Sequence, residues 1–163
     1  GAGVHGGEVI AEGPLKKILK AKGSLTADYL NGTREIAASD FYKSFLESDL
    51  AEDEMLTEIR VPKMNGAGWS FQKFNRRAQD WAIVGVAAWR GANGSGVGLV
   101  NMGQTPILAS GVSKALAGGA SIADAAALAV ADAQPSADNN ATVEYRTHLA
   151  KVLVRRALEQ ASA

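Results

Sequence analysis

Hydrophobic and polar residues alternate through the middle of the chain in the way that is typical of β-strands. The alternation runs over residues 56–61 and again over residues 69–74. An apolar run with one glycine at 81–89 predicts a buried strand, and residues 97–102 predict a fourth strand. Because short turns join these four segments, we expect an antiparallel sheet.

The chain that follows the predicted sheet is rich in alanine, and its apolar residues recur with helical spacing. We predict helices at 107–117, 121–133 and 143–161. Ser121 and Thr142 are suited to cap the second and third helices, because each hydroxyl can accept a backbone N–H of the first turn. Strands followed by helices favour an α+β fold, with an antiparallel sheet of three to four strands and about three helices packed on one face.

The N-terminal part of the chain predicts a smaller, separate unit. Residues 8–12 read as a short strand, and residues 15–22 have the apolar spacing of a basic helix. The residue pattern changes from Thr33 onward, and a short helix is expected over 39–46. We therefore predict a strand–helix appendage at 1–37 and a domain at 38–163.

Composition excludes several classes of function. Lysine plus arginine equals aspartate plus glutamate at 17 each, and this balance argues against an obligate nucleic-acid partner. The absence of cysteine excludes disulfides, thiolate metal sites, iron–sulfur clusters and a cysteine nucleophile in this sequence. Neither a membrane-spanning apolar run nor a signal-peptide pattern is present, so we expect a cytoplasmic location without membrane association.

Four other patterns have an ordinary structural interpretation. Residues 1–6 match G-x-G-x-x-G, but a strand-like segment follows them where a dinucleotide site needs a helix. The glycine-rich loop at 91–98 lacks the Gly-Lys-Ser/Thr of a P-loop and predicts a hairpin connection. His5 and His148 lack zinc-site spacing, and we expect His148 on a solvated helix face. The acidic residues of 47–54 lack the EF-hand pattern and predict a solvated loop.

The candidate site is a polar, doubly basic loop that leads directly into the apolar run at 81–89. Arg76, Arg77 and Asp80 lie within five residues of the chain. Charges beside a buried strand are costly unless they pair with each other or with a ligand. The loop is therefore either an ion-paired corner or a binding edge, and its guanidinium groups suit phosphates and flat rings.

The sequence of this loop and of the strand after it resembles a known family. Lys73-Phe-Asn-Arg-Arg-Ala-Gln-Asp80-Trp-Ala-Ile-Val-Gly-Val-Ala87 is similar to the C-terminal domain of the flavin-binding medium subunit of molybdenum hydroxylases, of the carbon monoxide dehydrogenase and xanthine dehydrogenase type. Further segments resemble the same family in the same order, over residues 33–163. They are Arg34-Glu-Ile-Ala-Ala-Ser-Asp-Phe41, Leu50-Ala-Glu-Asp-Glu-Met-Leu-Thr-Glu-Ile-Arg-Val-Pro62, Met102-Gly-Gln-Thr-Pro106 and the helix from Glu144 to Leu158.

The resemblance implies a function for the loop. In that family the complete subunit binds FAD and transfers electrons, and it assembles with a molybdenum-binding large subunit and an iron–sulfur small subunit. The loop near the flavin corresponds to Lys73, Arg76, Arg77 and Asp80, with Asp80 expected to orient the arginines. The lobes that carry the glycine-rich dinucleotide motifs have no counterpart here. We therefore expect half of an FAD site, an oxidoreductase subunit fragment that is inactive alone and does not bind FAD by itself.

Residues 1–37 resemble a different family, the excision-repair ATPase subunit UvrA. Gly1-Ala-Gly-Val-His-Gly-Gly-Glu-Val-Ile-Ala-Glu-Gly13 and Ser24-Leu-Thr-Ala-Asp-Tyr-Leu-Asn-Gly32 carry the likeness. The segment has no ATP-binding motif, ABC signature or zinc cysteine, so it implies no repair activity. The chain reads as a natural or constructed chimera.

A second function therefore stays open beside the redox one. The chain could be a catalytically silent assembly module without a cofactor, which associates with itself or with other subunits through the apolar helices at 121–133 and 143–161. A DNA-repair role would depend on residues 1–37 alone, and the neutral net charge gives it no electrostatic support.

Overall fold

The structure is a computed structural model that describes residues 15–18, 20, 22 and 33–162. The chain divides into two compact units, 1–38 and 39–163. In the first unit, helix α1 spans Leu15–Ile18 within the predicted helix 15–22. The predicted strand at 8–12 and the glycine-rich pattern at 1–6 lie outside the described residues.

The predicted helix at 39–46 is wrong over most of its length. Helix α3 spans only Ala38–Phe41, and the chain then forms a small antiparallel hairpin of β1 (Tyr42–Ser44) and β2 (Glu47–Ser48). The carbonyl of Phe41 accepts the N–H of Asp49 at 2.8 Å. A helix cannot continue through Leu46, whose φ is 59°.

The second unit contains the antiparallel sheet that the sequence predicted. Its strands are β3 (Gly68–Phe74), β4 (Val84–Gly91), β5 (Gly94–Val100) and β6 (Ile107–Leu108), in the order β3-β4-β5-β6. Each strand is antiparallel to its neighbours. Gly91 pairs with Gly94, so β4 and β5 are joined by a two-residue turn rather than the longer loop predicted at 91–98.

One predicted strand is absent from this sheet. Residues 56–61 belong to no strand, although their apolar and polar residues alternate as in a strand. Within the described residues this segment has no neighbouring strand to complete its backbone hydrogen bonds, and alternation alone does not supply one. The fourth strand is instead Ile107–Leu108, which the pattern assigned to the start of a helix. Strand β4 begins at Val84, and Trp81, the predicted strand start, is 80% exposed.

Three helices follow the sheet, as predicted. They are α4 (Ser110–Ala117), α5 (Ile122–Ala127) and α6 (Val143–Gln160). The hydroxyls of Ser121 and Thr142 accept backbone N–H groups of α5 and α6, so both predicted caps are confirmed. Helix α5 is shorter than the predicted 121–133, because the chain continues to Ala133 through tighter i→i+3 bonds.

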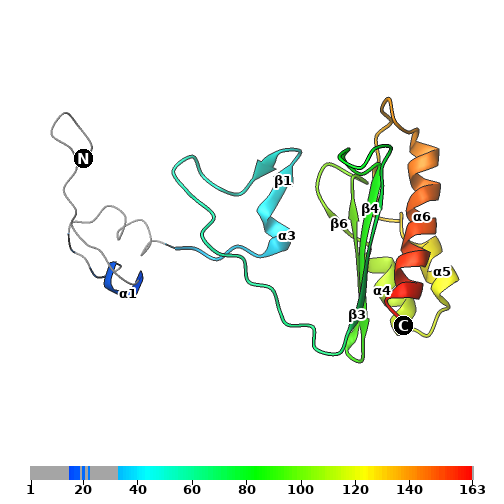
Figure 1. The fold of residues 1–163 in the computed structure, drawn as a ribbon, viewed down its shortest axis with the longest axis horizontal. Helices are drawn as coiled ribbons and strands as arrows, with labels where there is room; N and C mark the ends of the chain where they lie inside the picture. Colours follow the sequence, from blue (N-terminus) through cyan, green and yellow to red (C-terminus); the bar gives the residue numbers. More distant parts are fainter. Residues whose placement is uncertain (1–14, 19, 21, 23–32, 163) are drawn as a thin grey trace. The chain divides into compact units, whose positions relative to one another are not determined.

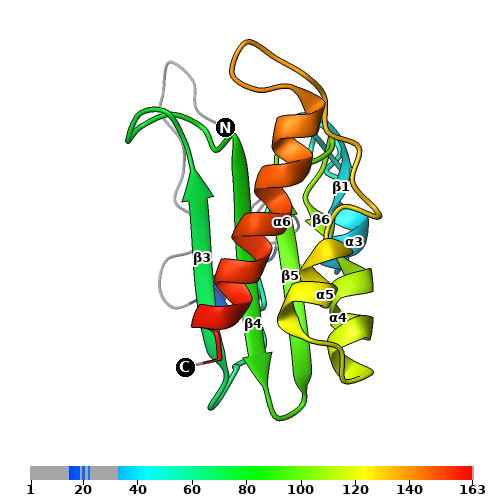
Figure 2. The same cartoon turned by 90° about the vertical axis from the view of Figure 1, so that its right-hand side faces the viewer.

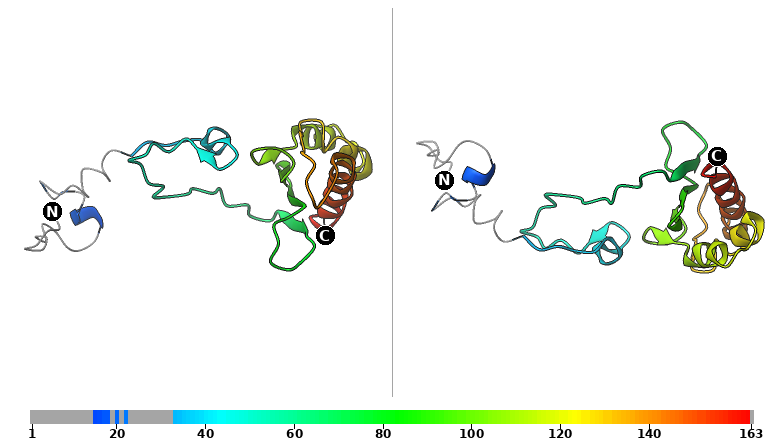
Figure 3. Two further views of the ribbon diagram at one scale, coloured as in Figure 1. Left: turned by 90° about the horizontal axis from the view of Figure 1, so that it is seen from above. Right: turned by 90° about the horizontal axis from the view of Figure 1, so that it is seen from below.

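All three helices cover the same face of the sheet. Helix α6 lies across β3 and β4, while α4 packs on β5 and α5 contacts both α4 and α6 (Figures 1 and 2). The views from above and below show the same layering (Figure 3). The approach is close at Gly68, where a Cβ atom would lie 2.0 Å from the carbonyl oxygen of Ala161. The α+β architecture with helices on one sheet face is therefore confirmed.

The core lies between these helices and the sheet. Its members are apolar residues of alternate strand positions and of the inner helix faces, among them Val84, Val86, Val97, Leu99, Val112, Leu153, Val154 and Leu158. The apolar faces of α5 and α6 are thus buried within the domain. They are not available as the subunit interface that the sequence suggested.

Candidate functional site

The candidate site is the loop at 75–83, which joins β3 to β4. The N–H of Ile83 bonds the carbonyl of Phe74 at 2.7 Å and closes the base of the loop. Inside the loop, the carbonyl of Arg77 accepts the N–H of Asp80 at 3.0 Å and the side-chain amide of Asn75. The loop therefore has an ordered backbone turn at its centre.

The four predicted site residues take different positions on this loop. Lys73 precedes it on β3 and is exposed, as are Arg76 and Arg77, while Asp80 is half-buried. Arg76 donates from Nη1 to Oδ1 of Asn140 at 3.1 Å. Among the described residues, no ion pair joins the Asp80 carboxylate to either arginine, and the contact of Asp80 with Arg77 runs through the backbone. The structure thus has no ion-paired corner here.

A polar network behind the loop was not predicted from the sequence. Arg146, on α6, is 2% exposed and donates to the carbonyl of Ile83, the last contact of the loop before β4. Its Nη2 forms an ion pair with Oδ2 of Asp138 at 2.5 Å. Its Nε is buried without a hydrogen-bond partner in the described structure. Arg146 therefore links the end of the loop to the connection that precedes α6.

Helical spacing could have revealed that Arg146 is buried. Arg146 lies three residues before Leu149 and seven before Leu153, on the apolar face of α6. His148 is exposed, as predicted, but Arg146 is not.

Asp138 organises the short connection before α6. Its Oδ1 accepts the N–H of Asn140 at 2.8 Å and the N–H of Ala141 at 3.0 Å. The backbone N–H of Asn140, then that of Ala141, and then the Arg146 guanidinium lower the pKa of the Asp138 carboxyl below its ordinary value, while partial burial opposes them. The carboxylate is therefore the stable form near neutral pH.

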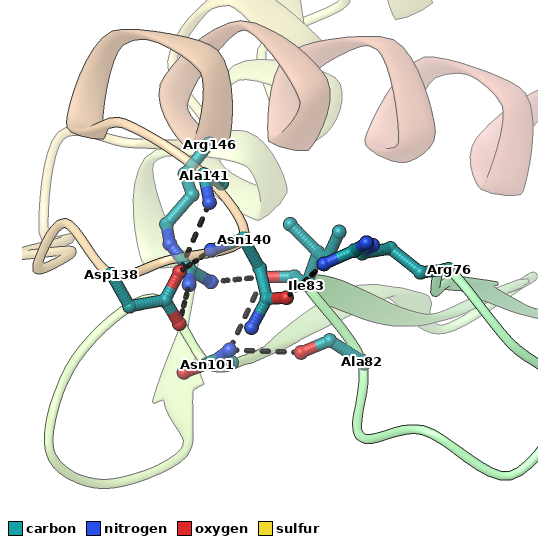
Figure 4. A network of polar contacts seen from close by, with 8 residues as sticks. All are labelled: Arg76, Ala82, Ile83, Asn101, Asp138, Asn140, Ala141 and Arg146. Atoms are coloured by element: carbon teal, nitrogen blue, oxygen red, sulfur yellow. Dashed lines mark hydrogen bonds and ion pairs between the residues drawn. The ribbon is translucent and has the colours of Figure 1, made fainter.

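Asn101, the residue that follows β5, completes the network. It has a φ of 61°, a conformation that asparagine tolerates better than most residues. Its Nδ2 donates to the carbonyl of Ala82 at 2.8 Å and to that of Ile83 at 3.3 Å. Figure 4 shows these contacts converging on the end of the loop from α6, from the connection before it and from Asn101 after β5.

The sheet face that α4, α5 and α6 leave uncovered carries exposed apolar side chains. Trp69 is 76% exposed, Phe71 55% and Leu108 68%. They line a groove of about 440 Å³ together with Val61, Pro62 and Met64 of the segment that precedes β3. A Cβ atom on Gly98, in its floor, would meet only the carbonyl oxygen of Ala87, at 4.0 Å. We call this surface the open face.

The described residues contain no cluster of three or more side chains with metal-ligand chemistry. A search of the same residues finds no helix with the length and hydropathy needed to cross a membrane.

Comparison with known proteins identifies the family. The family model for the CO dehydrogenase flavoprotein C-terminal domain matches residues 69–161. This chain belongs to that family. The resemblance seen in the sequence is thereby confirmed, and the match includes the whole β3–β4 loop and the helices behind it.

Relatives extend the family match over most of the chain. The carbon monoxide dehydrogenase medium chain of Afipia carboxidovorans is 34% identical over 142 residues, which are 81% of this chain and 49% of that protein. A solved carbon monoxide dehydrogenase from Hydrogenophaga pseudoflava has 33% identity and a TM-score of 0.75, covering 81% of this chain and 50% of its own. The chain spans about half the length of the curated relatives that it matches in this family.

A second, shorter likeness involves a different protein. The UvrABC system protein A of Escherichia coli (strain K12) is 61% identical over 36 residues, which are 22% of this chain and 4% of that protein. The likeness to UvrA noted in the sequence is therefore also found by comparison.

Proposed function

We propose that this member of the CO dehydrogenase flavoprotein family forms one wall of an FAD site in a redox subunit. The observation that carries the proposal is the cationic loop at the end of β3, within the family match. Lys73, Arg76 and Arg77 are exposed, and none has an ion pair among the described residues. These cations are therefore able to contact a ligand.

The residues of this chain fit a flavin dinucleotide in two respects. Guanidinium and ammonium groups bind phosphates, and guanidinium planes also stack on flat rings. Lys73 lies on the open face beside Phe71, and the glycine floor around Gly98 leaves room for a flat group. A bound flavin would accept and pass on electrons, and this chain would hold and orient it.

The chain covers about half of its relatives, so part of the proposed FAD site would lie outside it. We expect the dinucleotide to need contacts from the half of the relatives that this chain does not cover. In that view Asp80 supports the loop through its backbone bond to Arg77. The large molybdenum-binding and small iron–sulfur subunits are the proposed partners of the complete assembly, which we expect to be cytoplasmic.

The test is a fluorescence titration with FAD, first of this chain and then of the chain mixed with the uncovered half of the Afipia carboxidovorans medium chain. We expect saturable quenching in the mixture that is weakened by Arg76→Ala and Arg77→Ala. Arg156→Ala is the matched control, because Arg156 is an exposed arginine on α6, away from the loop. Quenching that all three variants share equally, or no quenching in either sample, would refute the FAD site.

The second candidate function is a catalytically silent assembly module. The open face favours it, because exposed apolar patches often mark protein interfaces. A chimera of residues 1–37 and 38–163 is part of this reading, supported by likenesses to two different proteins over 81% and 22% of the chain. If the chain does not bind flavin but associates with itself, as measured by sedimentation, this function would be favoured.

A further inference from the structure

The two neighbouring arginines of the loop differ in how they are held. Arg76 donates to Oδ1 of Asn140 across 64 positions of sequence. Arg77 has an exposed side chain without a hydrogen bond or ion pair among the described residues. One guanidinium is therefore anchored from outside the loop, and the other is not.

The partner of Arg76 is itself fixed in place. The backbone N–H of Asn140 bonds Oδ1 of Asp138 at 2.8 Å, and the N–H of Asp138 bonds the carbonyl of Ala141 at 3.0 Å. These bonds close a compact turn immediately before the Thr142 cap of α6. The Asn140 side chain thus projects from a defined backbone.

The turn is connected to the interior through a single buried cation. Arg146 forms an ion pair with Asp138 and also bonds the carbonyl of Ile83, the last residue of the loop. From Arg146 one set of contacts runs through Asp138 and Asn140 to Arg76, and a separate bond reaches Ile83 at the end of the same loop (Figure 4). Arg146 therefore contacts both the loop and the turn that carries Asn140.

We infer that Arg146, Asp138 and Asn140 are positioning residues that hold the Arg76 guanidinium ready for an anionic group of the cofactor. Arg76 has five N–H donors, and one bond to Asn140 leaves the others for a phosphate. A side chain immobilised in advance avoids the ordering cost that binding otherwise carries. Arg77, without such an anchor, adjusts to the ligand. The binding part of this inference depends on the proposed FAD site, whereas the anchoring of Arg76 does not.

The first test needs no flavin. Nitrogen-15 relaxation of the arginine Nε–Hε groups should show a more ordered Arg76 than Arg77 in the unaltered chain. Asn140→Ala should bring Arg76 to the level of Arg77. Asn139→Ala is the matched control, because Asn139 is an exposed amide in the same turn without a hydrogen bond among the described residues. Equal order of the two arginines, or an Arg76 that is unaffected by Asn140→Ala, would overturn the anchoring.

The second test uses the FAD titration in a double-mutant cycle. Asn140→Ala should weaken FAD binding about twofold to tenfold in the unaltered background and not at all when Arg76 is already alanine. The same loss in both backgrounds would overturn the positioning role. If FAD does not bind in any sample, the proposed function and the binding role both fail, and the relaxation data still decide whether Asn140 anchors Arg76. A thermal melt checks that Asn140→Ala, at an exposed site, leaves the fold intact.

Discussion

The two faces of the β3–β6 sheet differ in burial: helices cover one face, and the other is exposed. The covered face, against α4, α5 and α6, holds Val84, Val86 and Leu99 with no exposed surface. The open face carries Trp69 and Leu108 with more than half of their surface exposed. The same alternation of residues produced both faces, so alternation defines which residues share a face but not whether that face is covered.

The largest expected effect comes from truncating one leucine on each face. Leu99→Ala removes a side chain with no exposed surface and should lower the free energy of unfolding by about 2–5 kcal/mol. Leu108→Ala, at 68% exposed, should change it by less than about 0.5 kcal/mol. Urea denaturation of both variants measures the difference. Similar losses for the two leucines would mean that the open face is covered in solution.

Alternation predicted the long strands of the sheet, whereas the short strands β1 and β6 lie where helices were predicted. Residues 69–74 became β3, because β4 completes its backbone hydrogen bonds. Residues 56–61 have a comparable pattern and form no strand. The prediction failed there because periodicity carries no information about whether a partner strand is present. The helix at 143–161 and its cap at Thr142 were predictable, because both depend on local sequence.

The candidate site was predictable only in part, for the same reason. The basic loop is a local feature of the sequence, so its residues could be named in advance. The bond from Arg76 to Asn140 joins residues 64 positions apart, and no local pattern encodes it. Arg146 is intermediate between these cases, since helical spacing placed it on the buried face of α6 although its charge suggested solvent.

A smaller effect on the free energy of unfolding is expected from Asp138, which pairs with the buried Arg146, and this effect should depend on pH. The pKa of Asp138 is lowered, first by the N–H of Asn140, so its carboxylate stabilises the fold above the ordinary aspartate pKa of about 3.9. This contribution is lost as pH falls through the folded-state pKa. Asp138→Asn should therefore reduce stability at pH 7, and the difference from the unaltered chain should shrink in acid. Urea denaturation from pH 7 to pH 3 measures it.

The matched control is an exposed carboxylate outside the sheet. The pKa of Glu58 is also lowered, by a hydrogen bond and an ion pair from Arg60, but both side chains are more than half exposed. Exposed pairs of this kind contribute little to stability. Glu58→Gln should therefore leave stability almost unchanged at every pH. An Asp138→Asn variant that behaves like Glu58→Gln would show that the buried Arg146 does not depend on its carboxylate partner.

The smallest expected effect belongs to the open face itself. Phe71 and Phe74 lie on one strand with their side chains on opposite faces, and Phe74 packs edge-to-face on Tyr145 of α6 with ring centroids 6.5 Å apart. Phe74→Ser should lose that contact, worth about 0.5–1.5 kcal/mol beyond the lost burial. Phe71→Ser should leave stability within about 0.5 kcal/mol and reduce binding of a hydrophobic fluorescent dye. If Phe71→Ser destabilises the chain as much as Phe74→Ser, the open face packs against another part of the protein, and its groove is then an interior contact rather than a free surface.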